Sequence, residues 1–258
     1  MSFFAEPRPT QLDGLSADEL ARHLGLPRVA LYDAVGSTLD VAHRLAPEAA
    51  SGTLVVADEQ TAGRGRQGRR WQSEPGAGLW ITLIERPADA RALDVLALRC
   101  GLYAAESLDA LAGGTVQVKW PNDLHLGARK LAGILIETRW RGTTPDWVAI
   151  GFGLNVREPA LATAIGLTEG ASRLAALECV VPALRRAAGA SRHLSRDELA
   201  RWHARDHTAD RVIVEPAAGR AVGIESDGQL VVLSPDGVIS RHRTGSLTLA
   251  DPVPQPCS

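Results

Sequence analysis

Four arginines and three glycines occur within nine residues, in the segment 63–71 with the sequence GRGRQGRRW. Each guanidinium group offers a planar pair of N–H donors that matches the oxygens of carboxylates and phosphates. Glycines allow backbone N–H groups to approach a ligand closely. The segment therefore predicts a site for a small anion, with a solvated basic loop or a nucleic-acid contact as the alternatives.

Lysine is the second unusual feature, because only Lys119 and Lys130 among the 28 basic residues are lysine. An ammonium is a compact charge on a flexible stem, and a guanidinium does not replace it at a specific site. Both lysines lie in one short stretch, within the sequences KWPNDL (119–124) and RKLAGILIE (129–137). We expect both lysines to bind anionic groups, and codon bias with chance is the alternative.

A glycine-rich motif, GFGLN, occupies residues 151–155 after an apolar strand that ends at Ile150. Its glycines allow a ligand close to the backbone, and Asn155 presents an amide at the end of the strand. A tight bend is the simpler explanation of this motif taken alone. Likewise, Trp120, Pro121 and Asn122 are typical of a strand end that enters a turn.

The surrounding elements predict an α+β fold. Apolar runs at 52–57 and 78–84 predict two buried strands with the arginine segment between them, and further strands are expected at 116–120, 131–138 and 147–150. Apolar residues at helical spacing over 93–111 predict an amphipathic helix that places Cys100 in the core. We therefore expect a mixed sheet with helices packed against it.

Helix starts are marked by short polar residues. Ser16 with Glu19, and Ser195 with Glu198, have the spacing of a capping box, and Ser37 can cap a helix that contains Val41.

From residue 211 onward, short β-rich runs alternate with Asp-Gly and Thr-Gly pairs, which favour hairpins. This texture predicts a small antiparallel barrel. We expect an N-terminal extension with a short helix (1–29), a main domain (30–209), a small C-terminal domain (210–252) and a poorly ordered proline-containing tail (253–258).

Composition excludes several classes. The net charge of −2 argues against a general nucleic-acid binder. About 35 residues precede Ser37, too few for a winged helix-turn-helix. Three scattered cysteines favour reduced thiols, and no secretory signal or membrane-spanning run is present. We expect a cytoplasmic protein without a membrane or DNA partner.

Taken together and in this order, GRGRQGRRW, KWPNDL, RKLAGILIE and GFGLN resemble the biotin protein ligase family, the biotin-[acetyl-CoA-carboxylase] ligases, over about residues 32–249. The resemblance implies a monofunctional type without a DNA-binding domain. Its catalytic domain would be similar to that of class II aminoacyl-tRNA synthetases and would precede a small SH3-like barrel. The substrates would be ATP, with Mg²⁺, and biotin, which is activated as biotinyl-5′-AMP. A lysine of a biotin carboxyl carrier protein would then displace AMP.

The same resemblance implies roles for individual residues. The catalytic residues would be Lys130 and Arg66, and Asp123 would bind Mg²⁺. Biotin would contact Ser37, Thr38, Leu39, Gln60, Arg64, Gly65, Arg66, Lys130, Gly133 and Gly151, and the nucleotide would contact Arg69, Trp71, Lys119, Asn122 and Asn155.

Leu39 departs from the family pattern, because asparagine is common at that position and its side-chain hydrogen bonds are lost here. The arginine segment would order as a lid over the adenylate, with 156–170 as a second lid. Within the segment we expect Arg69 to fix the closed loop and Arg70 to face water.

Three points stay open on the sequence. A lipoate protein ligase shares the architecture and the adenylate chemistry, although the arginine segment argues against it. A nucleic-acid-binding regulator would use that segment but would not explain Lys130, Asp123 and Asn155. A homodimer is neither required nor excluded.

Overall fold

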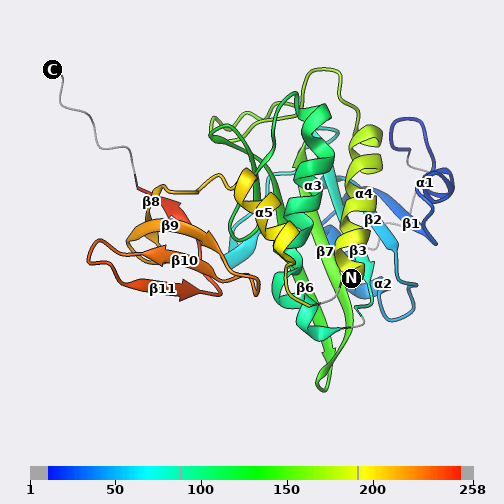
Figure 1. The fold of residues 1–258 in the computed structure, drawn as a ribbon. Coiled ribbons are helices and arrows are strands. Elements are labelled where there is room, and N and C mark those ends of the chain that lie inside the picture. Colours follow the sequence, from blue (N-terminus) through cyan, green and yellow to red (C-terminus); the bar gives the residue numbers. More distant parts are fainter. Residues whose placement is uncertain (1–10, 88, 191, 251–258) are drawn as a thin grey trace.

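A seven-stranded sheet with the order β1-β2-β3-β7-β6-β5-β4 organises the computed structural model, which describes residues 11–87, 89–190 and 192–250 (Figure 1). Neighbouring strands are antiparallel except β1 and β2. The α+β class and the mixed sheet predicted from sequence are confirmed. The strands are β1 (Val29–Val35), β2 (Thr53–Gln60), β3 (Gly78–Glu85), β4 (Gln117–Lys119), β5 (Asp123–Leu126), β6 (Arg129–Arg141) and β7 (Thr144–Asn155).

Both faces of this sheet are buried, and alternating side chains serve the two faces. In β2, Leu54 and Val56 belong to the large core, whereas Val55 belongs to a smaller core that includes Val41. The large core lies under α3 (Leu96–Ala112) and α4 (Arg173–Gly189), which run across the same face of the sheet (Figure 1). The smaller core lies under α2 (Thr38–Leu45) on the opposite face.

The helix starts follow the predicted caps. Capping boxes at Ser16 and Ser195 open α1 (Ala17–His23) and α5 (Arg196–Arg205), and the Ser37 hydroxyl accepts the Leu39 N–H at the start of α2. The helix expected at 93–111 is α3, and it buries Cys100 as expected. A short 3₁₀ helix, η2 (Ala90–Val95), precedes it. Helix α4 has no counterpart among the predicted elements.

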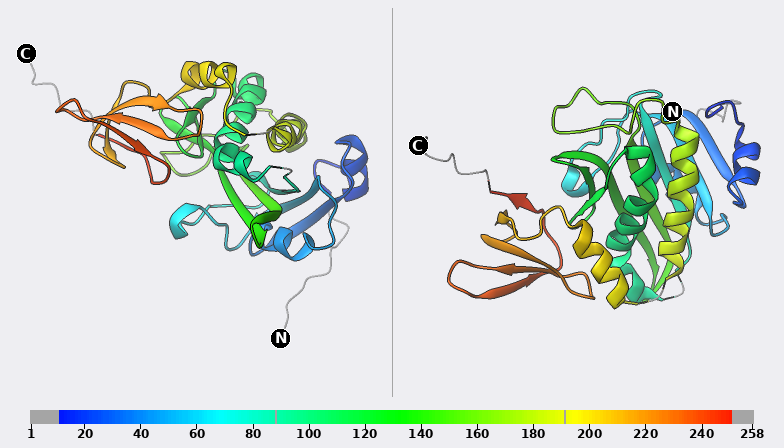
Figure 2. Two further views of the ribbon diagram at one scale, coloured as in Figure 1. Left: turned by 60° about the horizontal axis from the view of Figure 1, so that its bottom comes forward. Right: turned by 45° about the horizontal axis from the view of Figure 1, so that its top comes forward.

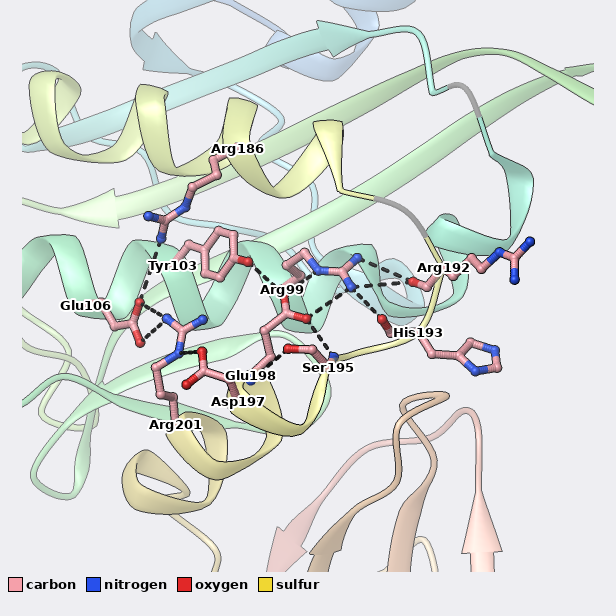
Figure 3. A network of polar contacts seen from close by, with 10 residues as sticks. All are labelled: Arg99, Tyr103, Glu106, Arg186, Arg192, His193, Ser195, Asp197, Glu198 and Arg201. Carbon is pink, nitrogen blue, oxygen red and sulfur yellow. Dashed lines mark hydrogen bonds and ion pairs between the residues drawn. The ribbon is translucent and has the colours of Figure 1, made fainter.

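A buried ion pair joins α5 to α3 (Figure 3). Arg99 Nε donates to Glu198 Oε1 at 2.6 Å, and the Tyr103 hydroxyl donates to the same oxygen at 2.7 Å. The Arg99 and Glu198 side chains are 1% and 8% exposed. An unpaired charge at this depth costs several kcal/mol, so the pair holds α5 against α3.

The C-terminal strands form a second sheet, antiparallel, with five strands among the described residues and the order β11-β10-β9-β8-β12. Turns at Asp227-Gly228 and Asp236-Gly237 connect its hairpins as predicted. No pairing joins β11 to β12 in the described part, where β12 has only two residues. The expected closed barrel is therefore not confirmed. The strands are β8 (Val212–Glu215), β9 (Gly219–Ile224), β10 (Leu230–Leu233), β11 (Ile239–His242) and β12 (Thr248–Leu249).

This second sheet lies beside α5 at one side of the main sheet (Figure 2). Trp120 Nε1 donates to the Gly228 carbonyl at 3.1 Å across the junction. At the same junction the rings of His125 and His207 stack with centroids 4.4 Å apart. The Trp120 hydrogen bond places the turn between β9 and β10 next to the turn between β4 and β5.

Two further predictions concern the chain ends and the membrane. The proposed tail 253–258, Cys257 and residues 1–10 lie outside the described residues. Within the described ranges, no helix has both the length and the apolarity to cross a bilayer.

Candidate active site

The candidate site lies on the face of the sheet that α2 covers. Strand alternation directs Thr82, Leu135 and Ala149 toward this face, together with Gly151 and Gly153 farther along β7. A Cβ atom at Gly151 would lie 3.2 Å from Leu39. The glycines leave the sheet surface hollow at this place, and the resulting pocket encloses about 980 Å³, its open mouth included.

Strand β7 is longer than the sequence analysis expected. It continues through Asn155 instead of ending at Ile150, so the GFGLN motif is part of the strand and is not a tight bend after it. Gly151 pairs with Thr82 and with Leu135, because a glycine keeps both backbone hydrogen-bonding groups although it has no side chain to pack.

The arginine segment forms a small hairpin over the pocket. Arg64 and Arg70 form an isolated antiparallel bridge, and the Gly65 N–H donates to the Arg69 carbonyl at 2.8 Å. At the tip, Gln67 adopts the left-handed conformation with φ of 56°, a conformation that is uncommon for a residue other than glycine. The hairpin therefore presents its side chains from a defined backbone.

Trp71 ends the hairpin, and its indole lies against two paired glycines of the sheet. A Cβ atom at Gly133 would come within 2.9 Å of the indole, and one at Gly153 within 2.7 Å. Both distances are shorter than real Cβ contacts. Lys130 Nζ lies 5.0 Å from the centroid of the same ring, within the range of a cation–π interaction. The glycines of two separate motifs thus provide the space for one tryptophan.

Cationic side chains are frequent in the lining of the pocket. Among the described residues that line it, Asp123 is the acidic side chain, and it pairs with Lys130 at 2.7 Å. Arg66 Nη1 donates to Asn122 Oδ1 at 3.3 Å. Cationic lining residues are Arg64, Arg66, Arg69, Arg70, Lys119 and Lys130.

The positions of Asn122 and Asp123 follow from a turn. β4 ends at Lys119 and β5 begins at Asp123, with a cis peptide bond between Trp120 and Pro121. Asn122 Nδ2 donates to the Ile134 carbonyl at 2.7 Å, which leaves Oδ1 toward Arg66. The expected strand-to-turn structure of this motif is confirmed, and the turn lines the pocket.

Burial shifts the proton affinities of two of these cations. Burial lowers the pKa of Lys119, and the nearby Asp123 carboxylate opposes that shift. Burial also lowers the pKa of Arg66, against the same carboxylate. Partly desolvated cations interact more strongly with an incoming anion than cations in water do. This part of the pocket is suited to bind a polyanion.

The inner end of the pocket is polar but uncharged. Gln60 Oε1 accepts from the Thr38 N–H at 2.9 Å and from the Thr38 hydroxyl at 3.1 Å. The Thr82 hydroxyl, fully buried, donates to Thr38 Oγ1 at 2.9 Å. Apolar neighbours of this end include Leu39 and Leu135. Such an end can bind a small neutral ring with both donors and acceptors.

The structure brings together all but one of the residues predicted for the site. Asn155 is the exception. It lines an adjacent hollow with Trp80, and its Nδ2 donates to the carbonyls of Lys130 at 3.4 Å and Ile165 at 3.2 Å. Trp71 and Lys130 border both hollows. The predicted residues that line the main pocket are Ser37, Thr38, Leu39, Gln60, Arg64, Gly65, Arg66, Arg69, Trp71, Lys119, Asn122, Asp123, Lys130, Gly133 and Gly151.

Arg64 has partners within the protein. Its Nη2 lies 3.0 Å from Asp40 Oδ1 and 2.9 Å from Glu137 Oε2. Glu137 Oε2 also lies 2.8 Å from Nε2 of His43. The other ring nitrogen of His43, Nδ1, accepts from the Trp147 indole N–H at 3.1 Å. Since Nδ1 is an acceptor, the neutral ring carries its proton on Nε2. These contacts connect the hairpin to α2 and β6.

The sequence analysis missed contributions from the C-terminal sheet. Ser246 Oγ donates to Gln67 Oε1 at 2.9 Å and accepts from Arg69 Nη2 at 3.3 Å. Leu247 also lines the pocket. More than 170 residues separate Ser246 from the hairpin, so no local spacing could reveal the contact. Arg69 thus connects the loop to the C-terminal segment. Arg70 is exposed, as expected, and donates to the Thr61 carbonyl at 3.0 Å.

The loop after β7 lies along Lys130. The Lys130 N–H donates to the Thr163 carbonyl, and the Ile165 N–H donates to the Lys130 carbonyl, each at 2.9 Å. Arg129 pairs with Glu158 of the same loop. The backbone of Lys130 is therefore fixed on both sides.

A divalent metal would have one carboxylate to bind. Within the described ranges, no group of three or more His, Cys, Asp or Glu side chains could hold an ion. Mg²⁺ is usually bound by one or two carboxylates together with substrate phosphates. Asp123 beside the cationic cluster fits an ion that arrives with a nucleotide.

Residues 34–155 match the model of the Biotin/lipoate A/B protein ligase family. The bifunctional ligase/repressor BirA of Salmonella typhimurium is 33% identical over 95% of this chain and 81% of its own length. BirA of Bacillus spizizenii is 39% identical over 56% of this chain, and the match spans 44% of that relative. A biotin-[acetyl-CoA-carboxylase] ligase of Paracoccus denitrificans is 40% identical over 46% of this chain and 51% of its own.

Solved structures share the fold. The biotin protein ligase from Aquifex aeolicus in complex with biotin and ATP has a TM-score of 0.69 and 24% identity, over 86% of this chain and 98% of that one. The Leishmania major enzyme in complex with biotinyl-5-AMP has a TM-score of 0.60 and 25% identity, over 83% and 98%. With a relative 33% identical along nearly the whole chain, this protein belongs to the biotin protein ligase family.

Proposed function

We propose that this protein is an ATP-dependent biotin protein ligase that activates biotin as biotinyl-5′-AMP and transfers it to a lysine of an acceptor protein. One observation carries the proposal: a neutral polar end with Thr38 and Gln60, a cationic cluster that includes Lys130 and Arg66, and Trp71, whose indole lies 5.0 Å from Lys130, all line one pocket. These three environments correspond to the parts of a biotinyl adenylate. The name of the Paracoccus relative and the adenylate in the Leishmania structure support the same reaction.

In the first step, a carboxylate oxygen of biotin attacks the α-phosphorus of ATP. The bond from that phosphorus to the bridging oxygen of the β-phosphate breaks, and pyrophosphate leaves. Both reactants are anions, so fixed cations must offset their repulsion and the charge that develops on the phosphoryl oxygens. We assign this task to Lys130 and Arg66, with Lys119 and Asn122 on the side of the leaving phosphates.

Mg²⁺ bound to ATP would neutralise part of the phosphate charge. Asp123 is the residue that we assign to it. The carboxylate at present pairs with Lys130 at 2.7 Å, so metal binding would free the ammonium for the reacting oxygens.

Biotin would lie with its ureido ring at the inner end of the pocket. That ring has two N–H donors and one carbonyl acceptor, which short polar side chains such as Ser37, Thr38 and Gln60 can match. Leu39 and Leu135 would contact its apolar parts, and Gly133 and Gly151 would allow close approach. The carboxylate of biotin would point toward Lys130. Arg64 and Gly65 of the hairpin would cover the aliphatic side chain of biotin.

The adenine ring would stack on Trp71 and extend toward the hollow that Asn155 lines. Arg69 would lie beside its phosphates. The hairpin 63–71, and the loop 156–170 next to Lys130, would exclude water from the mixed anhydride, which hydrolyses readily.

In the second step, the amine of an acceptor lysine attacks the acyl carbon. AMP leaves with the bond electrons, and the nitrogen gives up one proton to form the amide. We propose a biotin carboxyl carrier protein as the acceptor, without a DNA partner, in the cytoplasm. The C-terminal strands would form an SH3-like unit, in the division 1–29, 30–209 and 210–252. We leave the choice between monomer and homodimer to measurement.

The test is pyrophosphate release from ATP with biotin, with lipoate and with neither acid, followed by transfer of labelled biotin to a carrier domain. We expect release with biotin and label on one carrier lysine. Release with lipoate alone would make the protein a lipoate ligase. Pyrophosphate release in the absence of both acids, or no release under any of the three conditions, would contradict both assignments.

A further inference from the structure

A chain of hydrogen bonds connects the inner end of the pocket to Trp71 through a residue with no assigned role, Ser73. From the sheet outward, Thr82 donates to Thr38, Thr38 donates to Gln60 Oε1, and Gln60 Nε2 donates to Ser73 Oγ at 2.9 Å. Ser73 Oγ lies 3.5 Å from the Trp71 carbonyl, a long contact at the limit of hydrogen bonding. Ser73 is 6% exposed.

The direction of these bonds is fixed by a backbone group. The Thr38 N–H is a donor, so the Gln60 atom that it contacts at 2.9 Å must be the carbonyl oxygen Oε1. The amide nitrogen therefore faces Ser73, and Ser73 Oγ acts as the acceptor. The hydroxyl hydrogen of Ser73 remains for the Trp71 carbonyl. The Thr38 N–H thus sets how the amide of Gln60 is turned, and Ser73 provides the acceptor for its nitrogen.

Close packing reinforces the same arrangement. A Cβ atom at Gly63 would lie 2.4 Å from the Trp71 carbonyl oxygen and 3.0 Å from Ser73 Oγ. The Trp71 N–H donates to the Gly63 carbonyl at 3.0 Å, and the Gln60 N–H donates to the Ser73 carbonyl at 3.3 Å. The segments 60–63 and 71–73 therefore lie side by side without free space, and Ser73 lies at their contact.

We propose that Ser73 is a positioning residue that sets the Gln60 amide and the Trp71 backbone together, so that the acid-binding and nucleotide-binding ends of the site form as one unit. The proposal rests on the proposed function, because Gln60 and Trp71 belong to its two ends. Without the hydroxyl, the amide nitrogen of Gln60 would lose its buried acceptor, and the Trp71 carbonyl would lose its contact with the same group.

The test compares Ser73→Ala with Ser73→Thr, which keeps the hydroxyl, and with Ser107→Ala as a control. Ser107 Oγ donates to the Ala104 carbonyl within α3, far along the chain from the loop. Dissociation constants for biotin alone and for an ATP analogue alone are measured by calorimetry. We expect Ser73→Ala to weaken both by about tenfold, the effect of leaving a buried donor unpaired, and Ser73→Thr to restore at least part of the loss.

A double-mutant cycle then separates positioning from a general loss of stability. In a Gln60→Ala background, Ser73→Ala should have little further effect on biotin affinity, because its target is gone. Additive effects, or a lowered Tm with unchanged affinities, would overturn the proposal.

A failure of the proposed function is recognised separately, since the wild-type protein would then bind no biotin. In that case amide hydrogen exchange of the ligand-free protein decides. We expect Ser73→Ala to speed exchange at Trp71 and Gln60, with helix α3 unchanged and with Ser107→Ala without effect on the loop. Unaltered exchange at Trp71 and Gln60 would also overturn the proposal.

Discussion

Lys130 and Arg66 have the central chemical task in the proposed reaction. Lys130 Nζ lies between Asp123 and the Trp71 ring, and Arg66 is held by Asn122. We predict that Lys130→Ala or Arg66→Ala lowers the rate of adenylate formation by about 100-fold or more, because each change removes a charge aimed at the reacting phosphate.

Burst measurements of pyrophosphate release, with thermal unfolding to verify the fold, check this prediction. Arg91→Ala is a suitable control, since Arg91 pairs with Asp89 on an exposed segment away from the pocket. Wild-type rates in either Lys130→Ala or Arg66→Ala would refute the assigned role.

Lys119 should give the reaction an alkaline limit. Burial lowers its pKa below the ordinary value of 10.5, with Asp123 opposing and Lys130 adding to the shift. As pH rises through the lowered pKa, the ammonium loses its charge, and attraction for phosphate falls. We predict that kcat/KM for ATP declines on the alkaline side below pH 10.5. In Lys119→Arg the decline should move to higher pH, because a guanidinium keeps its charge. An identical pH profile in this variant would contradict the prediction.

Residue types and spacing were sufficient to find most of the pocket, because its cations and glycines lie in short distinctive motifs. They were insufficient for Ser73, Ser246 and Glu137. Serine and glutamate are common residues, and only the tertiary fold shows that these three contact the arginine hairpin. Asn155 lies in the adjacent hollow, where its amide donates to two backbone carbonyls, and its contact with the nucleotide stays a prediction.

At the scale of elements, the hairpin 63–71 is held by ion pairs of Arg64 with α2 and β6. The Arg64, Asp40 and Glu137 side chains are between 30% and 51% exposed, so each pair contributes at most about 1 kcal/mol. We predict that Asp40→Asn with Glu137→Gln increases proteolysis between Arg64 and Arg70 severalfold in low salt. The difference from wild type should shrink in high salt, because salt screens exposed pairs.

Limited proteolysis with and without biotin plus ATP is the measurement. Ligands should protect the wild-type hairpin, as expected of a lid. Glu225→Gln, which removes an exposed pair with Arg241 on the C-terminal sheet, serves as the matched control. Equal cleavage of the double variant and the wild-type protein at every salt concentration would exclude a role for the ion pairs.

Local patterns predicted five of the seven strands of the main sheet, because apolar runs with clear turn signals surround the arginine segment. Strands β1 and β5 have no counterpart among the predicted elements. The length of β7 was underestimated, since Gly151 and Gly153 have no β-propensity and hold their place through pairing with β3 and β6. The antiparallel hairpins at the C-terminus were predictable from Asp-Gly pairs. Whether that sheet closes into a barrel was not predictable from such pairs, because closure depends on pairing between strands that are distant in the sequence.

At the scale of the whole molecule, the buried Arg99–Glu198 pair fastens α5, the helix that precedes the C-terminal strands, to α3 on the main sheet (Figure 3). Burial alone would raise the pKa of Glu198, but hydrogen bonds from Arg99, the Ser195 N–H and Tyr103 outweigh it and lower the pKa to about 2. The unfolded value is near 4.5. The pair therefore stabilises the fold above pH 4.5, and this contribution is lost as pH falls toward 2.

We predict that Glu198→Gln lowers the free energy of unfolding by about 3 kcal/mol near pH 6, because it leaves Arg99 buried without a counter-charge. The difference between wild type and variant should shrink between pH 4.5 and pH 3. Urea unfolding at several pH values measures it, with Asp197→Asn on the exposed side of α5 as the control. A difference that is the same at pH 6 and pH 3 would contradict the assignment.

The position of the C-terminal sheet was beyond sequence reasoning, yet it completes the site. Trp120 bonds to Gly228, and Ser246 holds Gln67 and Arg69 of the hairpin. These contacts join segments more than 100 residues apart in the sequence, so no local pattern could reveal them. Family resemblance anticipated the presence of a second unit, whereas its contacts required the structure.

The central claim is that this site joins biotin to AMP, and pyrophosphate–ATP exchange tests it most directly because it needs no acceptor protein. Radiolabelled pyrophosphate is incubated with the enzyme, ATP and Mg²⁺, with and without biotin. Label should enter ATP only when biotin is present, and Lys130→Ala should abolish the exchange. Exchange that is independent of biotin, or its absence in an enzyme that binds both substrates, would contradict the claim.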